Sequence, residues 1–127
     1  MIARFFSLFF AIVFFVNSAS AADASPSALQ TDFRVFFAAK RPWDYPVAKD
    51  TGGLAKRAQE AQQDYRRVEP RLKLQHVNTF EDSQRHLLFL AFEIAQDSPV
   101  YRTDFYLVYV YDRSHRRFVG RVHIPMA

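Results

Sequence analysis

The most informative feature of this chain of 127 residues is what it lacks: it has no cysteine and only three glycines. Without cysteine there are no disulfide bonds, no thiolate nucleophile and no cysteine metal ligand. Gly52, Gly53 and Gly120 are too few and too scattered for the usual phosphate-cradling loop. The serines stand in neither a G-x-S-x-G nor an S-x-x-K motif. The sequence therefore indicates no particular reaction.

The first residues carry an export pattern. A short segment ending at Arg4 is followed by the apolar run Phe5–Val16 and by the small residues Ala19–Ala21. This order is typical of a secretory signal peptide with an A-x-A cleavage site. The alternative, a membrane anchor, would need roughly 20 apolar residues to cross a bilayer as a helix. We expect residues 1–21 to be a cleavable signal peptide and residues 22–127 to be a single small domain.

The absence of cysteine also bears on location and partners. Small eukaryotic secreted domains are often held together by disulfides, so an exported chain without cysteine favours a bacterial periplasmic or secreted protein. The formal net charge of +4 is spread along the chain rather than gathered in a stripe. Such a charge is compatible with an acidic partner or an anionic envelope surface, and it does not indicate a nucleic-acid footprint.

Two helices are predicted before the strands. Ser25–Ser27 offers capping residues for a helix over residues 27–40, whose phenylalanines recur at helical spacing. A short strand is the alternative here, because Phe33, Val35 and Phe37 also alternate. The second helix is expected to be capped by Asp50 or Thr51.

This second helix should end near Val68, ahead of the helix-breaking Pro70. It carries a narrow stripe of apolar residues and a wide polar face that includes Asp64. That pattern predicts a helix lying on a sheet with its polar face in water.

The last part of the chain predicts four strands, at residues 72–80, 86–95, 104–111 and 117–124. Short connections favour antiparallel hairpins, and the two middle segments are apolar on both faces. The fold class is therefore α+β, with two N-terminal helices packed on a four-stranded antiparallel meander. This order of elements is similar to that of the cystatin-like and nuclear-transport-factor-like folds, a resemblance of architecture alone.

A loop braced by Pro42 and Pro46 holds Trp43 and Tyr45. Aromatic residues on a restrained loop are good recognition anchors, since little entropy is lost when they dock. They are equally suited to closing one end of a small core.

One face of the predicted sheet is a second candidate for partner binding. If Tyr109 lies across from Gly120, the face away from Tyr109 shows an apolar centre that includes Phe89, with basic residues such as Arg117 and Arg121 around it. An apolar centre with a charged border is typical of a protein contact. Alternatively, the first helix crosses this face and buries it.

A third candidate is a pocket lined by histidines and tyrosines. Pairing Leu74 with Leu88 would set His76 opposite His86. If Leu88 in turn meets Tyr109 or Val110, then His86 comes close to Tyr111 or Asp112, and the pocket candidates are His76, His86, Tyr109 and Tyr111. Histidines hydrogen-bonded at the margin of a core are the simpler interpretation, and we predict neither a metal nor a cofactor.

Pairing Phe92 with Phe105 would also place the carboxylates of Glu93 and Asp104 opposite each other. Such a pair does acid–base work only when its two pKa values are driven apart, which an exposed strand end does not favour.

These features lead to one main hypothesis and several alternatives. The main hypothesis is a non-enzymatic module in the periplasm that binds another envelope protein, for example to inhibit or escort it, through Trp43, Tyr45, Phe89, Arg117 and Arg121. The alternative is a protein or enzyme with a small-ligand pocket. Adhesion to anionic lipid or polysaccharide and formation of a homodimer remain open.

Overall fold

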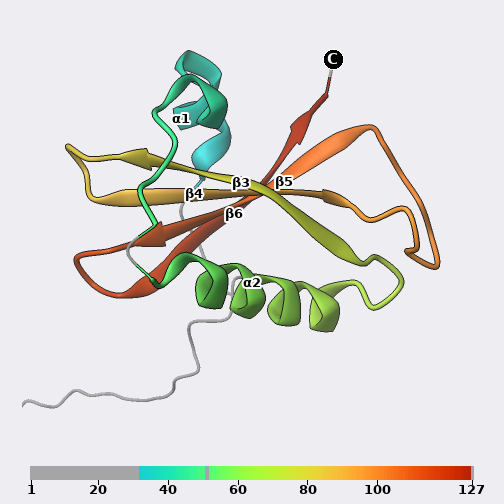
Figure 1. Ribbon diagram of the computed structural model, residues 1–127. Coiled ribbons are helices and arrows are strands. Elements are labelled where there is room, and N and C mark those ends of the chain that lie inside the picture. The colour runs from blue at the N-terminus through green and yellow to red at the C-terminus, as the bar shows by residue number, and fades with distance from the viewer. Residues whose placement is uncertain (1–31, 51, 127) are drawn as a thin grey trace, which may run out of the picture.

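A four-stranded antiparallel sheet forms the middle of the molecule in the computed structural model, which describes residues 32–50 and 52–126. Its strands are β3 (Leu74–Asp82), β4 (Leu87–Ile94), β5 (Phe105–Asp112) and β6 (Arg117–Pro125). The order in the sheet is β3-β4-β5-β6, so each strand pairs with its neighbour in the chain (Figure 1). The predicted α+β class and antiparallel meander are confirmed.

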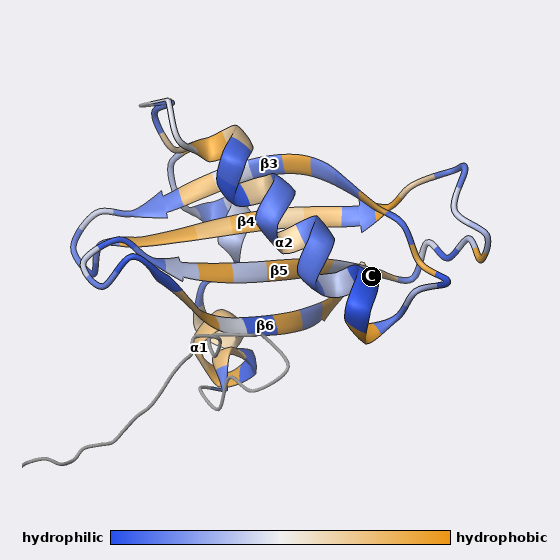
Figure 2. Ribbon diagram, turned by 90° about the horizontal axis from the view of Figure 1, so that it is seen from below, coloured by the Kyte–Doolittle hydropathy of each residue, from blue (hydrophilic) through white to orange (hydrophobic). Residues whose placement is uncertain are grey.

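Helices lie on both faces of this sheet. The α-helix α1 (Phe33–Ala39) and the short 3-10 helix η2 (Pro42–Asp44) come first, and α2 (Leu54–Val68) follows. Figures 1 and 2 show α2 crossing one face and α1 lying on the other, so the domain has a helix–sheet–helix arrangement. Within the described ranges, neither helix has the length and apolar content needed to cross a membrane.

Helix α1 is short but has a defined start. Asp32 is its N-cap, and its Oδ1 accepts a hydrogen bond of 3.0 Å from the backbone N–H of Arg34. The helical interpretation of this segment is confirmed over the strand alternative. The expected start at Ser25–Ser27 and the predicted signal peptide lie outside the described residues.

Helix α2 ends as expected at Val68, but its predicted cap is wrong. The N-cap is Gly53, which has no side chain to bond the first turn, whereas Asp50 Oδ1 accepts a hydrogen bond of 2.8 Å from Gly52 N. Asp50 therefore closes the loop before the helix instead of capping the helix itself; Thr51 lies in the undescribed gap.

Two hydrophobic clusters hold these layers together, one on each face of the sheet. Under α2, Ala58, Ala61 and Tyr65 pack on inward-facing residues of all four strands. On the opposite face, Phe33 and Phe37 of α1 pack on a second set, which comprises Phe89, Ala91, Val108, Val110, Val122 and Ile124. The middle strands serve both clusters, which explains why their sequences are apolar on both faces. The sheet face that contains Phe89 is thus covered by α1, which is the second of the two alternatives for that face.

The β3–β4 and β5–β6 hairpins close with loops of the same design. In the first, Asp82 Oδ1 accepts hydrogen bonds from the backbone N–H groups of Gln84 and Arg85, and the next residue, His86, adopts φ 58°. In the second loop Asp112 plays the same part for Ser114 and His115, and Arg116 adopts φ 55°. A left-handed residue at the end of a short loop sets where the returning strand begins.

The first loop explains why the predicted β3–β4 register is wrong. The turn was expected at residues 79–83, but it lies at 83–86, so that Asp82 faces Leu87 and Leu74 faces Ile94. His76 therefore lies opposite Phe92 and far along the strand from His86.

The other two pairings also differ from the expected registers. Leu88 faces Tyr111, and Phe92 faces Leu107 rather than Phe105, so the expected apposition of Glu93 and Asp104 does not form. On the far side, a bulge after Val110 places Gly120 opposite Val110 and leaves Tyr109 opposite Arg121. An extra residue in one strand moves every later side chain to the other face. The bulge also means that the predicted position of Arg121 is wrong. Its side chain points toward α2 instead of toward the α1 face.

Candidate functional site

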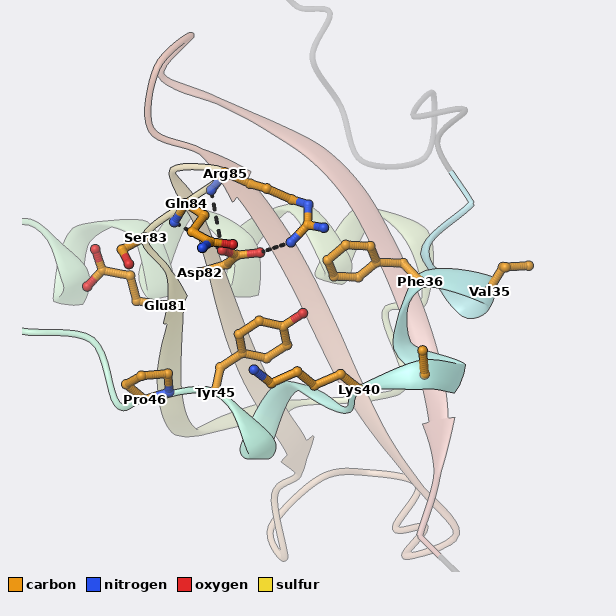
Figure 3. Close-up of a pocket in the computed structure, with 11 residues that line it drawn as sticks. Val35, Phe36, Lys40, Tyr45, Pro46, Glu81, Asp82, Ser83, Gln84 and Arg85 are labelled. Carbon is orange, nitrogen blue, oxygen red and sulfur yellow. Dashed lines mark hydrogen bonds and ion pairs between the residues drawn. The ribbon is translucent and has the colours of Figure 1, made fainter.

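An open groove of about 650 Å³ runs between α1 and the β3–β4 hairpin. Figure 3 shows the side chains that line it, which come from α1, from the segment after η2 and from the hairpin loop. A hollow of this size is in the range of sites for small ligands or for a short stretch of a partner chain.

Two parallel aromatic rings form its apolar part. Phe36 and Tyr45 have ring centroids 6.4 Å apart with an interplanar angle of 8°. Both rest on the fully buried Phe89, at 5.9 Å and 5.0 Å between centroids. Phe89 thus fixes the position of both rings from below, while their upper edges line the groove.

Each ring is accompanied by a cation. Lys40 Nζ lies 4.2 Å from the centroid of the Tyr45 ring, and Arg85 Cζ lies 5.3 Å from that of Phe36. Arg85 also binds the buried Asp82, with its Nη1 2.7 Å from Oδ2. Among the described residues Lys40 has no ion pair, so its ammonium group is the cation that this groove offers to a partner.

The titration behaviour of the groove follows from these contacts. Burial raises the pKa of Tyr45, the negative charge of Asp82 raises it further, and Arg85 opposes both. The hydrogen bond to Asp82 raises the pKa of Arg85. The phenol of Tyr45 is therefore neutral at neutral pH, and it lies beside the ammonium group of Lys40, an arrangement suited to binding an apolar group next to an anionic one.

The five residues predicted to bind a partner do not form one surface. Tyr45 lines the groove. Trp43 is half-buried, with its ring 5.3 Å from that of Tyr106, and it packs at the edge of the core, which is the second of the two roles expected for this loop. Phe89 is fully buried beneath Tyr45 and has no surface to offer. Arg117 is exposed at the start of β6, whereas Arg121 lies on the opposite face under α2.

The four pocket candidates are also separated. His76 is half-buried near the start of β3, and its Nε2 lies 2.8 Å from Thr79 Oγ1, while His86 is exposed in the hairpin loop. Tyr109 and Tyr111 are buried beneath α2. None of the four lines the groove. Across residues 32–50 and 52–126, no three His, Asp or Glu side chains are placed to hold a metal ion.

A buried polar cluster between α2 and the sheet was missed by sequence reasoning. The Tyr109 hydroxyl donates a hydrogen bond of 3.2 Å to Asp64 Oδ2, and Arg121 Nη1 lies 3.9 Å from the same oxygen. Burial raises the pKa of Tyr109 far above its ordinary value, and the charge of Asp64 adds to the effect. Tyr109 is thus a neutral hydrogen-bond donor that ties β5 to α2.

One signal for this cluster was present in the sequence. Asp64 lies three residues after Ala61 and four before Val68, which places it beside the apolar stripe of α2. The sequence pattern predicts Asp64 on the solvated face, whereas in the structure it is buried.

Comparison with protein-family models, with curated proteins and with solved structures finds no significant match to this chain. The class of protein is therefore defined by the fold alone, as a small α+β domain in which two helices cover a four-stranded antiparallel sheet.

Proposed function

We propose that this protein is an exported, non-enzymatic module that binds another protein of the cell envelope, and that the groove beside α1 is its contact surface. The observation that carries the proposal is the pairing of each exposed ring edge in the groove with a cation. Aromatic and basic side chains at an open hollow are enriched where proteins bind one another.

Export is inferred from the pattern of residues 1–21, and binding rather than chemistry from the groove itself. Its two carboxylates are already engaged, Asp82 in an ion pair with Arg85 and Glu81 in one with Arg113. No nucleophile is paired with a base among its lining residues, which include Ser83 and Lys40. The two histidines of the small-ligand alternative lie apart, His76 opposite Phe92 and His86 in the hairpin loop, so they share no pocket.

Photo-crosslinking in cells that make the protein from its own gene tests this proposal. Val35 lies on the wall of the groove and is 76% exposed, so a benzophenone side chain at this position should crosslink one partner protein. The matched control is the same probe at Val68, at the end of α2 on the other side of the molecule and 41% exposed. The proposal expects the crosslinked product from Val35 alone.

A charge reversal then tests the role of the groove's unpaired cation. Lys40→Glu should remove most of the Val35 product without unfolding the domain, while Lys49→Glu, at an exposed position outside the groove, should leave it unchanged. Equal crosslinking from Val35 and Val68, or a product that survives Lys40→Glu, would count against the groove as the contact surface.

A further inference from the structure

The two edge strands of the sheet, β3 and β6, differ in their backbone hydrogen bonds to other segments of the described chain. At the β3 edge, Val47 forms a bridge with Phe80, Ala48 N donates a hydrogen bond of 2.9 Å to Thr79 O, and Glu81 N donates one of 2.8 Å to Pro46 O. The segment before α2 therefore covers part of β3. At the other edge, β6 pairs with β5 alone, and no backbone hydrogen bond joins β6 to a further segment of the described chain.

The open part of β6 is regular and short. The bulge near Val119 interrupts the strand, and Pro125 lacks an N–H group, so the stretch able to pair with another strand is Gly120–Ile124. From Gly120 onward each residue has a partner in β5. Alternate backbone N–H and C=O groups of an edge strand point away from its one neighbour and are available to a further strand.

A second hollow lies beside this edge. It has a volume of about 300 Å³, separates α1 from β6, and is lined by the apolar side chains of Phe37, Val122 and Ile124 and by Arg34 and Arg41. Arg34 is held by Asp32, with 3.1 Å between Nη2 and Oδ2. Arg41 has no ion pair within the part of the chain that the structure describes, and its guanidinium lies 5.7 Å from the Trp43 ring.

We propose that β6 accepts an extended, acidic segment of another protein as a fifth strand, and that a carboxylate of this segment binds Arg41 in the adjoining hollow. Main-chain hydrogen bonds to Gly120–Ile124 would supply affinity, and the hollow would select the side chain that points toward α1. This surface lies on the other side of α1 from the groove, so the inference does not depend on the groove being a contact.

Charge favours such a segment over a second copy of this chain. If β6 paired with β6 of another copy in antiparallel fashion, the two α1 helices would lie on the same face of the joined sheet. The Arg41 side chains of both copies would then face one seam without a carboxylate partner among the described residues of their own chain, whereas each Arg34 is paired with Asp32, and like charges close together are destabilising. An acidic strand meets Arg41 with the opposite sign.

Amide hydrogen exchange followed by NMR tests the pairing directly. The probe is a set of synthetic peptides of about eight residues in which valine or threonine alternates with aspartate or glutamate, long enough for one added strand. Adding them to the full protein as purified should slow exchange at alternate amides within Gly120–Ile124 and leave β3 amides unchanged. A matched set with lysine in place of each acid should have no effect.

Affinity measurements on variants test the role of the arginine. Arg41→Glu should weaken binding of the acidic peptides by about tenfold, the effect of losing one favourable charge pair and gaining a repulsive one. Lys56→Glu makes the same kind of charge reversal on an exposed site of α2 and should leave the affinity unchanged.

Three results would overturn the proposal. One is slow exchange at the outward β6 amides before any peptide is added, which would mean that the edge is occupied by the chain itself or by a second copy. Another is absence of binding, or equal binding of the acidic and basic peptides. The third is protection in the loop at residues 83–86 instead of β6. None of these three results changes what is expected from crosslinking at Val35. Failure of the β6 proposal can therefore be told apart from failure of the proposed function.

Discussion

The ring of Phe33 lies directly on Gly120, so closely that a β-carbon added to residue 120 would come within 2.4 Å of Cδ2 of that ring. The absence of a side chain at Gly120 thus allows α1 to pack closely against β6. Because α1 has only seven residues, its position depends on such side-chain contacts more than on its own helical hydrogen bonds.

Replacing this glycine should loosen α1. We expect Gly120→Ala to lower the free energy of unfolding by about 1–3 kcal/mol, the usual cost of overpacking a close contact. Chemical denaturation measures the change. Since the clash is with Phe33, the double variant Phe33→Ala/Gly120→Ala should lose less than the sum of the two single changes, and strict additivity would contradict the account.

The buried cluster under α2 predicts unequal effects for its members. Tyr109→Phe removes one hydrogen bond to Asp64 and should cost about 1 kcal/mol. Asp64→Ala removes the carboxylate beside Arg121 and should cost about 2–3 kcal/mol, because a mostly buried cation loses its counter-charge. Urea denaturation of both variants gives the comparison. If Asp64→Ala were as mild as Tyr109→Phe, the cluster would not hold α2 on the sheet.

The left-handed residues of the two hairpin loops predict that glycine stabilises. Arg116 has φ 55°, a conformation that costs a residue with a β-carbon roughly 1–2 kcal/mol. After allowance for the added freedom of the unfolded chain, Arg116→Gly should raise the free energy of unfolding by about 0.5–1 kcal/mol. Arg116→Ala is the control, because it removes the same side chain but keeps the strain, and it should bring no such gain.

A pH dependence is expected from His76. Burial lowers the pKa of its imidazole, and a hydrogen bond with the backbone of Asn78 partly offsets this. The unfolded chain therefore takes up a proton more readily than the folded one, so the free energy of unfolding should fall as the pH drops below about 6.5, the ordinary value for histidine. The loss should be complete below the folded-state pKa.

Denaturation at pH 7.5 and at about pH 5.5 measures this loss, above the range where carboxylates titrate. The His76→Gln variant should show a smaller difference between the two conditions than the original chain. The same replacement at the exposed His86 serves as the control. An unchanged difference in the His76 variant would remove this histidine from the explanation.

Much of the fold could be predicted because the secondary structure depends on local sequence patterns. The four strands were expected within about two residues of their observed ends, since alternation and turn residues act over short stretches. The double-sided apolar pattern of Leu88–Phe92 correctly indicated a strand covered on both faces. Register was beyond the same reasoning, because it depends on the conformation of single loop residues such as His86 and on the bulge at Val119.

The candidate site was predicted less well for a related reason. Tyr45 was correctly placed on a restrained loop, but Phe36 and Arg85 reach the same groove from segments far apart in sequence. From the sequence, Arg121 and Phe89 are expected on the same face of the sheet. The bulge in β6 turns Arg121 toward α2. Phe89 stays on the α1 face, where it is buried beneath Tyr45. Proximity of this kind is a property of the tertiary structure alone.

The sequential order of the strands has a consequence for how the chain folds. Because β3, β4, β5 and β6 each pair with their neighbour along the chain, every pairing in the sheet is made across a single connection. Closing short loops costs little entropy, so sheets of this topology reach the native state faster than those that bring distant strands together.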